Sequence, residues 1–420
     1  MKALKLTGLL ATTGLALALA APAAAQQQKL VIESWRNDDL AIWQEKIIPA
    51  FNKAHPNITV EFSPTAPKDY NAALNAKLAS GTAGDIITCR PFDASLGLFQ
   101  KGYLTPLSDL KGIENFPDTA KVAWTTDDGK TTFCLPMASV IHGFIYNADA
   151  FQELGIQPPK TESEFFAALE KIRADGRYTP LAMGTSEQWE AATMGFQNVG
   201  PNYWQGEAGR TKLIKGQAKL TDAEYVKTFE QIAKWKPYLP KGFEAQTYAD
   251  SQNMFTLGRA VIYPAGSWEI ALFNQQADFK MGAFLPPKPD NAQECYISDH
   301  TDIGMGINKA SKNQDAARTF LEWAATKEFA EIYANELPGF FSLSKHEVAL
   351  KDPLAQEFVN WRKQCKSTIR NSYQILSRGE PNLENEMWAT SARVVSGTLS
   401  PQDAAKQLQA GLDKWYKPAP

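Results

Sequence analysis

The sequence predicts an α/β fold whose mostly parallel sheets are flanked by helices. Short runs of β-forming residues at 30–35, 58–62 and 85–89 alternate with two amphipathic helical segments. This β-α-β-α-β order is typical of a parallel sheet with helices on its faces. The 420 residues are also enough for two sizeable lobes of this kind, each with its own core.

The first two predicted helices are defined by the spacing of their apolar residues. Trp43, Ile47 and Phe51 recur at helical intervals, and we expect Pro49 to remove one hydrogen bond from that helix. A second helix presents Leu74 and other apolar residues inward and ends at a glycine, a common helix terminator.

Helix start signals continue along the rest of the chain. A Ser or Thr followed three residues later by Glu or Gln, the pattern of a capping box, occurs at 161–164, 221–224 and 311–314. Near the end, Ser400 followed by Pro401 predicts one more helix start. The chain therefore keeps its α/β character to its end.

The N-terminal segment has the pattern of a secretory signal peptide. Two lysines precede an apolar run at 6–20, and the small residues at 23–25 form a cleavage site before Gln26. The apolar run is shorter than the ~20 residues of a membrane-spanning helix, the alternative interpretation. We therefore expect residues 1–25 to be removed and the mature chain to be exported to the periplasm.

Composition argues against several classes of function. Lys and Arg number 43 against 46 Asp and Glu, so no charge excess points to a nucleic-acid partner. The motifs of common hydrolases, zinc enzymes, phosphate-binding loops and dinucleotide sites do not occur, and we expect no catalytic residue, metal or cofactor. A glycosidase, which needs only two carboxylates without a fixed motif, remains an alternative. The 11 tryptophans and 13 tyrosines exceed ordinary core needs and suit the apolar faces of sugar rings.

The four cysteines are Cys89, Cys134, Cys295 and Cys365. An even count in an oxidising compartment favours disulfides, and three connectivities are possible. Proximity in the chain favours Cys89 with Cys134 and Cys295 with Cys365. Four buried free thiols are the alternative.

Several motifs, in order and at consistent spacing, identify a family. They are Gly-Asp-Ile-Ile at 84–87, the segment 136–147 ending in Phe-Ile-Tyr-Asn, Phe-Thr-Leu-Gly-Arg-Ala at 255–260, Ala-Gly-Ser-Trp at 265–268 and Gly-Met-Gly-Ile-Asn-Lys at 304–309. Together they resemble extracellular solute-binding protein family 1, the maltose-binding-protein-like sugar receptors of ABC importers. The resemblance runs over nearly the whole mature chain, from about Leu30 to Trp415.

This resemblance implies a two-lobed periplasmic-binding-protein fold of type II, hinged by crossing segments. The first lobe would comprise residues 26–138 and 299–342, and the second residues 139–298 and 343–420. A monomeric receptor would hold a small carbohydrate in the cleft and deliver it to membrane permease subunits. A receptor for an anionic sugar (a uronide) or a polyol is the alternative to a neutral mono- or oligosaccharide receptor.

The first candidate ligand contacts follow the carboxyl ends of predicted strands, where parallel sheets bind ligands. Trp35, Arg36 and Asp38 follow the first strand, and Arg90 and Asp93 follow the third. The maltose receptor has a stacking Trp and a sugar-binding Asp in this latter loop. Here no Trp occupies the loop, a departure that leaves the ligand open. The two arginines either bind hydroxyls or a carboxylate, or form ordinary ion pairs.

The remaining candidates come from the hinge segments and from family positions of the second lobe, with core packing or hinge pairing as the alternative role. They are His142, Trp189, Gly266, Ser267, Trp268, Asp299, His300, Asp302 and Trp388.

Overall fold

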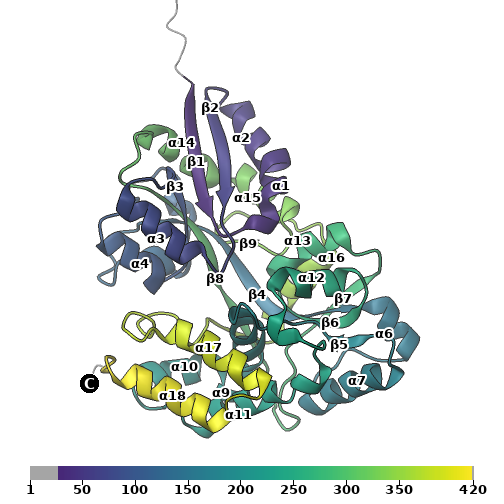
Figure 1. Cartoon of the computed structure of the whole chain (residues 1–420). Helices are drawn as coiled ribbons and strands as arrows, with labels where there is room; N and C mark the ends of the chain where they lie inside the picture. Colours follow the sequence, from purple (N-terminus) through teal and green to yellow (C-terminus); the bar gives the residue numbers. More distant parts are fainter. Residues whose placement is uncertain (1–26, 419–420) are drawn as a thin grey trace, which may run out of the picture.

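The computed structural model describes residues 27–418, so the predicted signal peptide and its cleavage site lie outside the described residues. The chain folds into two α/β lobes joined by long strands (Figure 1). In the first lobe, a parallel sheet has helices on both faces. Its elements are β1 (Gln28–Ser34), β2 (Ile58–Pro64), β3 (Ile86–Cys89), α1 (Leu40–Ile42), α2 (Ile48–Ala54), α3 (Tyr70–Ser80), α4 (Asp93–Gln100), α5 (Asp118–Lys121), α14 (Gln314–Ala324) and α15 (Lys327–Glu336).

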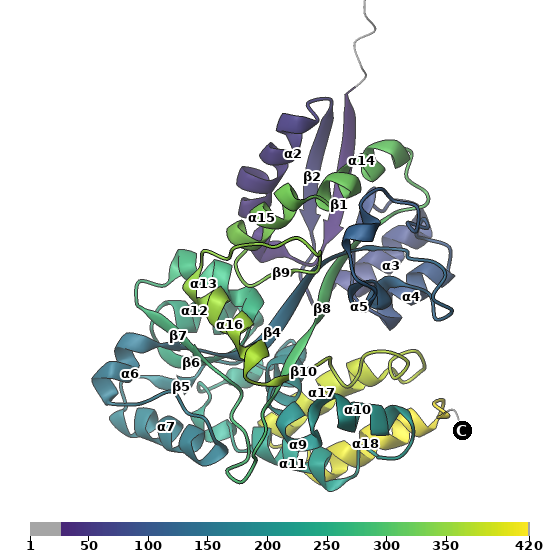
Figure 2. The ribbon, with the colours of Figure 1, turned by 180° about the vertical axis from the view of Figure 1, so that it is seen from behind.

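The second lobe contains most of the helices. Its elements are β5 (Thr179–Leu181), β6 (Ala260–Gly266), β7 (Met281–Phe284), β10 (Lys366–Thr368), α6 (Ala148–Leu154), α7 (Glu162–Asp175), α8 (Gln197–Val199), α9 (Pro201–Trp204), α10 (Gly206–Ile214), α11 (Ala223–Ala233), α12 (Tyr248–Thr256), α13 (Ile270–Gln276), α16 (Pro353–Asn360), α17 (Leu383–Ser396) and α18 (Pro401–Asp413). The C-terminal helices α17 and α18 lie side by side at the edge of this lobe (Figures 1 and 2).

Two long strands connect the lobes. Strand β4 (Leu135–Asn147) pairs with β8 (Tyr296–Ile307) over its first half and with β6 and β7 over its second half. The short strand β9 (Phe341–Ser342) pairs with β4 near the same junction. The resulting strand order is β2-β1-β3-β8-β4-β6-β5. The pairs β1–β2, β1–β3 and β5–β6 are parallel, whereas β4 and β8 add antiparallel pairs where they cross (Figure 2).

The predicted first helix is built in three parts. A π-helical turn over Trp43–Ile47 separates α1 from α2, and Pro49 lies in the first turn of α2. A proline in the first turn removes an N–H that has little use inside the helix. The wider turn keeps Trp43 facing the core, where its ring stacks on Phe62 at 4.6 Å.

The predicted helix starts differ in accuracy. Thr161 forms the expected capping box with Glu164, and Ser400 caps α18. The other two predictions were wrong, because α11 and α14 begin after Asp222 and Asn313 instead. Ser311 instead bonds Asp85, the residue before β3, to which its hydroxyl donates at 2.6 Å.

Both disulfides follow the pairing that chain proximity favours. Cys89 at the end of β3 joins Cys134 before β4, and Cys295 before β8 joins Cys365 before β10. The first disulfide fixes the position of Cys89, the residue that immediately precedes Arg90. Within residues 27–418, no helix is long and apolar enough to cross a membrane, and no cluster of His, Cys, Asp and Glu is arranged to hold a metal.

Candidate functional site

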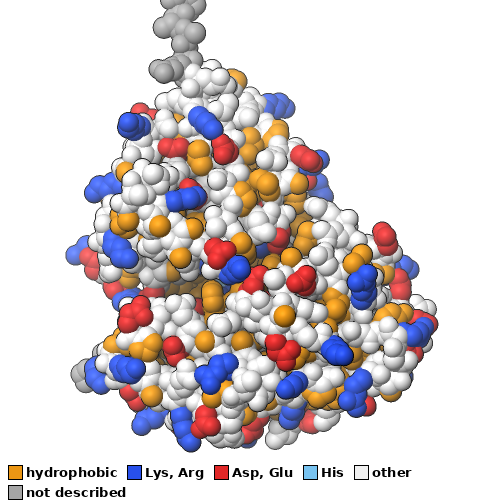
Figure 3. Space-filling view, in the orientation of Figure 1, with side chains coloured by type: hydrophobic (Ala, Val, Ile, Leu, Met, Phe, Trp, Pro, Cys, Tyr) orange, Lys and Arg blue, Asp and Glu red, His pale blue; other side chains and the backbone are white. Residues whose placement is uncertain are grey.

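Two adjoining cavities lie between the lobes, where the molecular surface is hollowed (Figure 3). The inner cavity has a volume of about 50 Å³, and the outer cavity about 330 Å³. Both are lined by Arg90 from the first lobe and by Arg370 and Trp388 from the second. The inner cavity is lined by Trp35, Arg36, Pro67, Arg90, Trp189, Thr193, Tyr248, Trp268, Asp302, Arg370 and Trp388.

Five of the eleven residues that line the inner cavity are aromatic. Trp35, at the end of β1, packs against Tyr70 with ring centroids 5.5 Å apart. On the opposite lobe, Trp189 meets Tyr248 edge-on at 4.7 Å. These rings come from separate chain segments, so the wall exists only because the fold brings both lobes together.

Trp268 is fixed in this wall by hydrogen bonds behind the cavity. Its Nε1 donates to Glu269 Oε1 at 3.1 Å and to Tyr248 Oη at 3.2 Å. Gly266 leaves the space its ring occupies, since a Cβ there would lie 1.9 Å from the indole. Burial raises the pKa of Glu269 to about 7, although hydrogen bonds from Gln252 and Tyr248 oppose the rise.

The arginines of the inner cavity differ in their partners. Arg36 forms a bidentate pair with Asp39, at 2.8 and 2.7 Å, and burial of this pair raises the pKa of Asp39. Arg370 is 3.3 Å from Glu384 of α17. These two guanidinium charges are therefore balanced by carboxylates outside the cavity.

Arg90 has neutral partners instead. Its guanidinium lies 4.4 Å above the ring of Trp35 and donates to Asn71 Oδ1 at 3.0 Å and to the Pro67 carbonyl at 3.3 Å. Burial lowers the pKa of Arg90, but an arginine stays charged. Its remaining N–H groups are available to the two cavities that it lines.

Asp302, on β8, is the one carboxylate that lines the inner cavity among the described residues. Only 9% of its surface is exposed, and burial raises its pKa while Arg370 and Arg90 counteract the rise. A buried carboxylate normally has hydrogen-bonded partners. Within residues 27–418 this one has no hydrogen-bond donor as a partner, and it lines the cavity.

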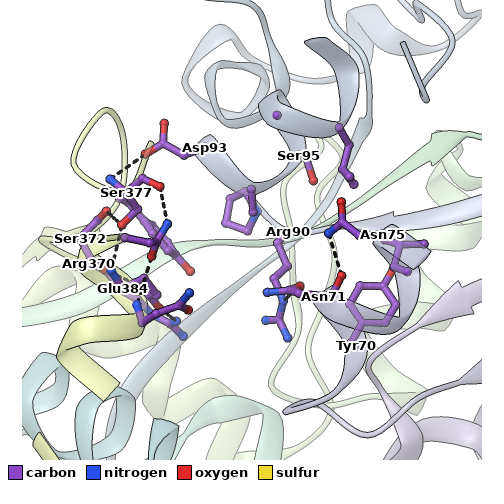
Figure 4. Close-up of a pocket in the computed structure, with 18 of the residues that line it drawn as sticks. Tyr70, Asn71, Asn75, Arg90, Asp93, Ser95, Arg370, Ser372, Ser377 and Glu384 are labelled. Carbon is purple, nitrogen blue, oxygen red and sulfur yellow. Dashed lines mark hydrogen bonds and ion pairs between the residues drawn. The ribbon is translucent and has the colours of Figure 1, made fainter. Parts of the chain in front are cut away.

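The outer cavity is the larger of the two. Figure 4 shows Tyr70, Asn71 and Asn75 of α3 on one side and Arg370 and Glu384 on the other, with Arg90 between them. Its lining is rich in amides and hydroxyls, which suit a polar, uncharged ligand.

Asp93 lies at the rim of the outer cavity, where residues of the other lobe occupy its oxygens. It accepts hydrogen bonds from the backbone N–H groups of Ile375 and Ser377, at 3.0 and 3.3 Å, and from Arg378 Nε at 2.6 Å. The dashed line from Asp93 in Figure 4 marks one of these contacts. Asp93 therefore bridges the lobes in this structure.

Seven of the predicted contacts, Trp35, Arg36, Arg90, Trp189, Trp268, Asp302 and Trp388, line the inner cavity. Asp38, Gly266, Ser267, Asp299, His142 and His300 line neither cavity.

These six residues support the cleft from behind. Asp38 accepts from Gln252 across the lobes at 3.3 Å, and Ser267 accepts from the Ile141 N–H of β4 at 3.1 Å. Asp299 forms a bidentate pair with Arg362, 2.8 Å for each contact. All three tie together segments near the crossing strands.

His142 and His300 form a buried pair where β4 crosses β8. Their Nε2 atoms are 3.0 Å apart, and Arg370 Nε donates to His300 at 3.2 Å. Burial lowers the pKa of both rings well below the usual value, and the positive charge of Arg370 lowers it further. His300 Nε2 accepts the hydrogen bond from Arg370, so the pair helps to hold Arg370 in place.

Sequence reasoning missed four residues of the inner cavity: Pro67, Thr193, Tyr248 and Arg370. Pro67 precedes α3, Thr193 lies in a π-helical turn, and Tyr248 is the first residue of α12. None of them directly follows a strand, the signal that located Trp35, Arg36 and Arg90. Arg370 lies two residues beyond β10, a three-residue strand too short to predict.

Comparison with known proteins identifies relatives over the full length of the chain. The family model for bacterial extracellular solute-binding proteins matches residues 34–331. The multiple sugar-binding protein of Streptococcus mutans is 24% identical over 441 residues, which cover 100% of this chain and 99% of that protein. The mannitol-binding protein of Pseudomonas aeruginosa is 24% identical over 76% of this chain and 73% of its own length.

A solved structure shares the two-lobed architecture. The bacterial solute receptor AcbH, with an exclusive preference for β-D-galactopyranose, superimposes with a TM-score of 0.79 at 19% identity. The alignment covers 92% of this chain and 99% of that one. The chain belongs to the bacterial extracellular solute-binding proteins.

Proposed function

We propose that this protein is the carbohydrate receptor of an ABC importer, which captures a small sugar between its lobes and delivers it to membrane permease subunits. The observation that carries this proposal is the inner cavity, whose walls combine four tryptophans with Arg36, Arg90, Arg370 and Asp302. Relatives whose names specify sugars or mannitol support it.

The lining matches the two surfaces of a sugar. Indole rings cover the apolar C–H faces of a pyranose, as aromatic rings cover other apolar groups. Guanidinium and carboxylate groups at the edges bind the hydroxyls, and each buried hydroxyl left without a partner would cost about 1–3 kcal/mol. Trp35, Trp189, Trp268 and Trp388 are therefore proposed contacts, together with the four charged residues.

Ligand binding would favour the closed arrangement of the lobes. Trp35, Arg90 and Asp302 belong to the first lobe, whereas Trp268 and Arg370 belong to the second. A ligand that touches both sets gains contacts only when the lobes are together, so it shifts the population toward closure.

The proposed lobe boundaries are residues 26–138 with 299–342 and residues 139–298 with 343–420. The strand pairing supports them, because β4 exchanges β8 for β6 and β7 a few residues after Ser139. β8 passes from one lobe toward the other beyond Asp299, and β9 lies beside the same crossing.

We propose a binding protein without catalysis, monomeric, without a nucleic-acid partner and located in the periplasm. A glycosidase places two carboxylates around the scissile bond. Within the described chain, the inner cavity has Asp302 as its single lining carboxylate. The family relationship and the signal-peptide pattern of residues 1–25 support the compartment.

The three arginines of the inner cavity also favour a second candidate, a receptor for an anionic sugar. A thermal-shift screen of the mature chain separates the two. Its probes are neutral hexoses and pentoses, maltose, cellobiose, xylobiose, raffinose, mannitol, glucuronate and galacturonate. A ligand that binds only the folded state raises the Tm. We expect the Tm to rise with at least one neutral sugar. A rise with uronates alone supports the second candidate, and no rise with any probe contradicts both.

A further inference from the structure

The inner cavity contains one positive and one negative group that do not pair with each other. Arg90 is hydrogen-bonded to neutral acceptors, and Asp302 accepts no hydrogen bond from the described residues. No Lys, Arg or His nitrogen of the chain between residues 27 and 418 lies within the 4.0 Å of an ion pair with Asp302. Both nevertheless line the same small cavity.

The other charged residues that line the cavity have ion-pair partners. Asp39 neutralises Arg36, and Glu384 neutralises Arg370. Of the lining residues, Arg90 and Asp302 remain, and their charges add up to zero. The carboxyl groups of Asp38 and Glu269 lie close by, so these neighbours add no positive charge. An anionic ligand would bring a second negative charge next to Asp302, and like charges in a buried site are strongly unfavourable.

Asp302 is also held within the sheet. It lies on β8, where its neighbours Thr301 and Ile303 pair with β4, and two residues after His300, which accepts a hydrogen bond from Arg370. A buried carboxylate on a sheet cannot easily turn away to find another partner. Its acceptor capacity is therefore directed into the space that the ligand fills.

We propose that Asp302 is the specificity-determining residue of the site, which accepts hydrogen bonds from two neighbouring hydroxyl groups of a neutral sugar while Arg90 donates to one of the same hydroxyls. This inference rests on the proposed function and specifies its ligand class. A hydroxyl can donate to a carboxylate and accept from a guanidinium at once, so one vicinal diol bridges the separated charges. Charge-assisted bonds of this kind are about twice as strong as neutral ones.

The cavity volumes agree with this arrangement. The inner cavity, about 50 Å³, has room for only a few water-sized groups, whereas the outer cavity offers about 330 Å³. A sugar would therefore insert its hydroxyl-bearing edge toward Asp302, and the rest would extend past Arg90, Arg370 and Trp388 into the polar outer cavity.

Isothermal titration calorimetry of the mature protein with the neutral sugar that gives the largest thermal shift tests the inference. We expect Asp302→Asn to weaken binding at least 100-fold, since the amide replaces one acceptor by a donor. The matched control is Asp315→Asn, an exposed position of α14 in the same lobe and outside both cavities, and it should stay within about 3-fold of the wild type. Melting curves establish that both variants are folded.

A second measurement uses only the wild-type protein. Among the monodeoxy analogues of that sugar, two adjacent positions should each lose at least 100-fold in affinity, because a site built for a hydroxyl rejects the analogue without it. Affinity of Asp302→Asn within 3-fold of wild type, equal losses in both Asp variants, or tighter binding of the corresponding uronate would overturn the inference. If no sugar binds the wild type, the proposed function itself fails.

Discussion

Arg378 Nε lies 2.6 Å from Asp93 Oδ1, and this contact joins the two lobes at the rim of the outer cavity. Arg378 also forms a bidentate pair with Asp127, 2.8 Å for each bond. Asp93 in turn accepts from the backbone of Ile375, one of two neighbouring residues with positive φ, 65°. Positive φ is unfavourable for a β-branched residue, so this loop shape depends on its partners. We call Asp93, Asp127 and Arg378 the interlobe clasp.

We predict that the ion pairs of the interlobe clasp stabilise the closed arrangement of the lobes. Arg378→Gln removes both ion pairs, which are partly exposed and worth about 1–2 kcal/mol together. We therefore expect ligand affinity to fall about 5- to 30-fold, mainly through faster dissociation, measured by stopped-flow tryptophan fluorescence. The control is Arg177→Gln, whose partners Glu153 and Asp175 lie within the second lobe. Equal affinity of Arg378→Gln and the control would show that the clasp has no role in closure.

We predict that the aromatic ring of Trp388 contributes directly to ligand affinity. It lines both cavities, and its Nε1 donates to Glu384 at 3.3 Å. Trp388→Ala should weaken binding by about 1–3 kcal/mol, by analogy with base–aromatic stacking, while Trp388→Phe should recover part of the loss. Trp268→Ala should have an effect of at least this size. Calorimetric affinity unchanged in Trp388→Ala would remove this residue from the site.

We predict that Glu269 makes the free energy of unfolding of the protein depend on pH. Burial raises its pKa from 4.5 to about 7, so between these values the unfolded chain loses this proton while the folded chain retains it. The free energy of unfolding therefore falls as the pH rises through this window, by about 1.4 kcal/mol per pH unit from this group. Glu269→Gln removes the effect. The difference in stability, variant minus wild type, should grow by about 3 kcal/mol between pH 4.5 and pH 7 and then level off.

Urea unfolding at several pH values measures this difference. Glu331→Gln, at an exposed position of α15, is the control and should show little change in its stability difference with pH. A stability difference for Glu269→Gln that does not vary with pH would mean that folding does not raise the pKa of Glu269.

We predict that the disulfide between Cys89 and Cys134 contributes both to the thermal stability of the protein and to its affinity for sugar. It closes a loop of 45 residues, for which loop entropy predicts about 4 kcal/mol of stabilisation. The double variant Cys89→Ser with Cys134→Ser should lower the Tm and also weaken sugar binding, because Arg90 loses its fixed neighbour. The Cys295 and Cys365 double variant is the control, since that bond lies away from the inner cavity. The affinity, at a temperature where both variants are folded, should fall only in the first.

The strand-end rule located one part of the site and could not locate the rest. Trp35, Arg36 and Arg90 follow parallel strands, and the local pattern was enough to find them. Arg370 and Tyr248 reach the cavity because β10 and α12 pack there, which depends on contacts far apart in the sequence. His142 has the alternation of a cleft-lining residue, yet its ring turns to His300, a partner 158 residues away.

Asp93 shows the limit of a local pattern. Its place after the third strand predicted a ligand contact, and it lines the outer cavity, but its carboxylate also accepts a hydrogen bond from Arg378. No local sequence pattern indicates that Arg378, 285 residues later in the chain, contacts Asp93. The helix start at Thr161 was predictable, because a capping box involves only neighbours in the chain. Predictions were thus accurate where the interaction is local and incomplete where a charged residue has a distant partner.

A crystal structure of the mature protein with its bound sugar tests the central claim most directly. We predict one sugar ring between the lobes, its hydroxyls within hydrogen-bond distance of Asp302 and Arg90 and a face against at least one of Trp35, Trp189, Trp268 and Trp388. A sugar bound elsewhere on the surface, or contacting residues of only one lobe with the cleft closed, would contradict the account.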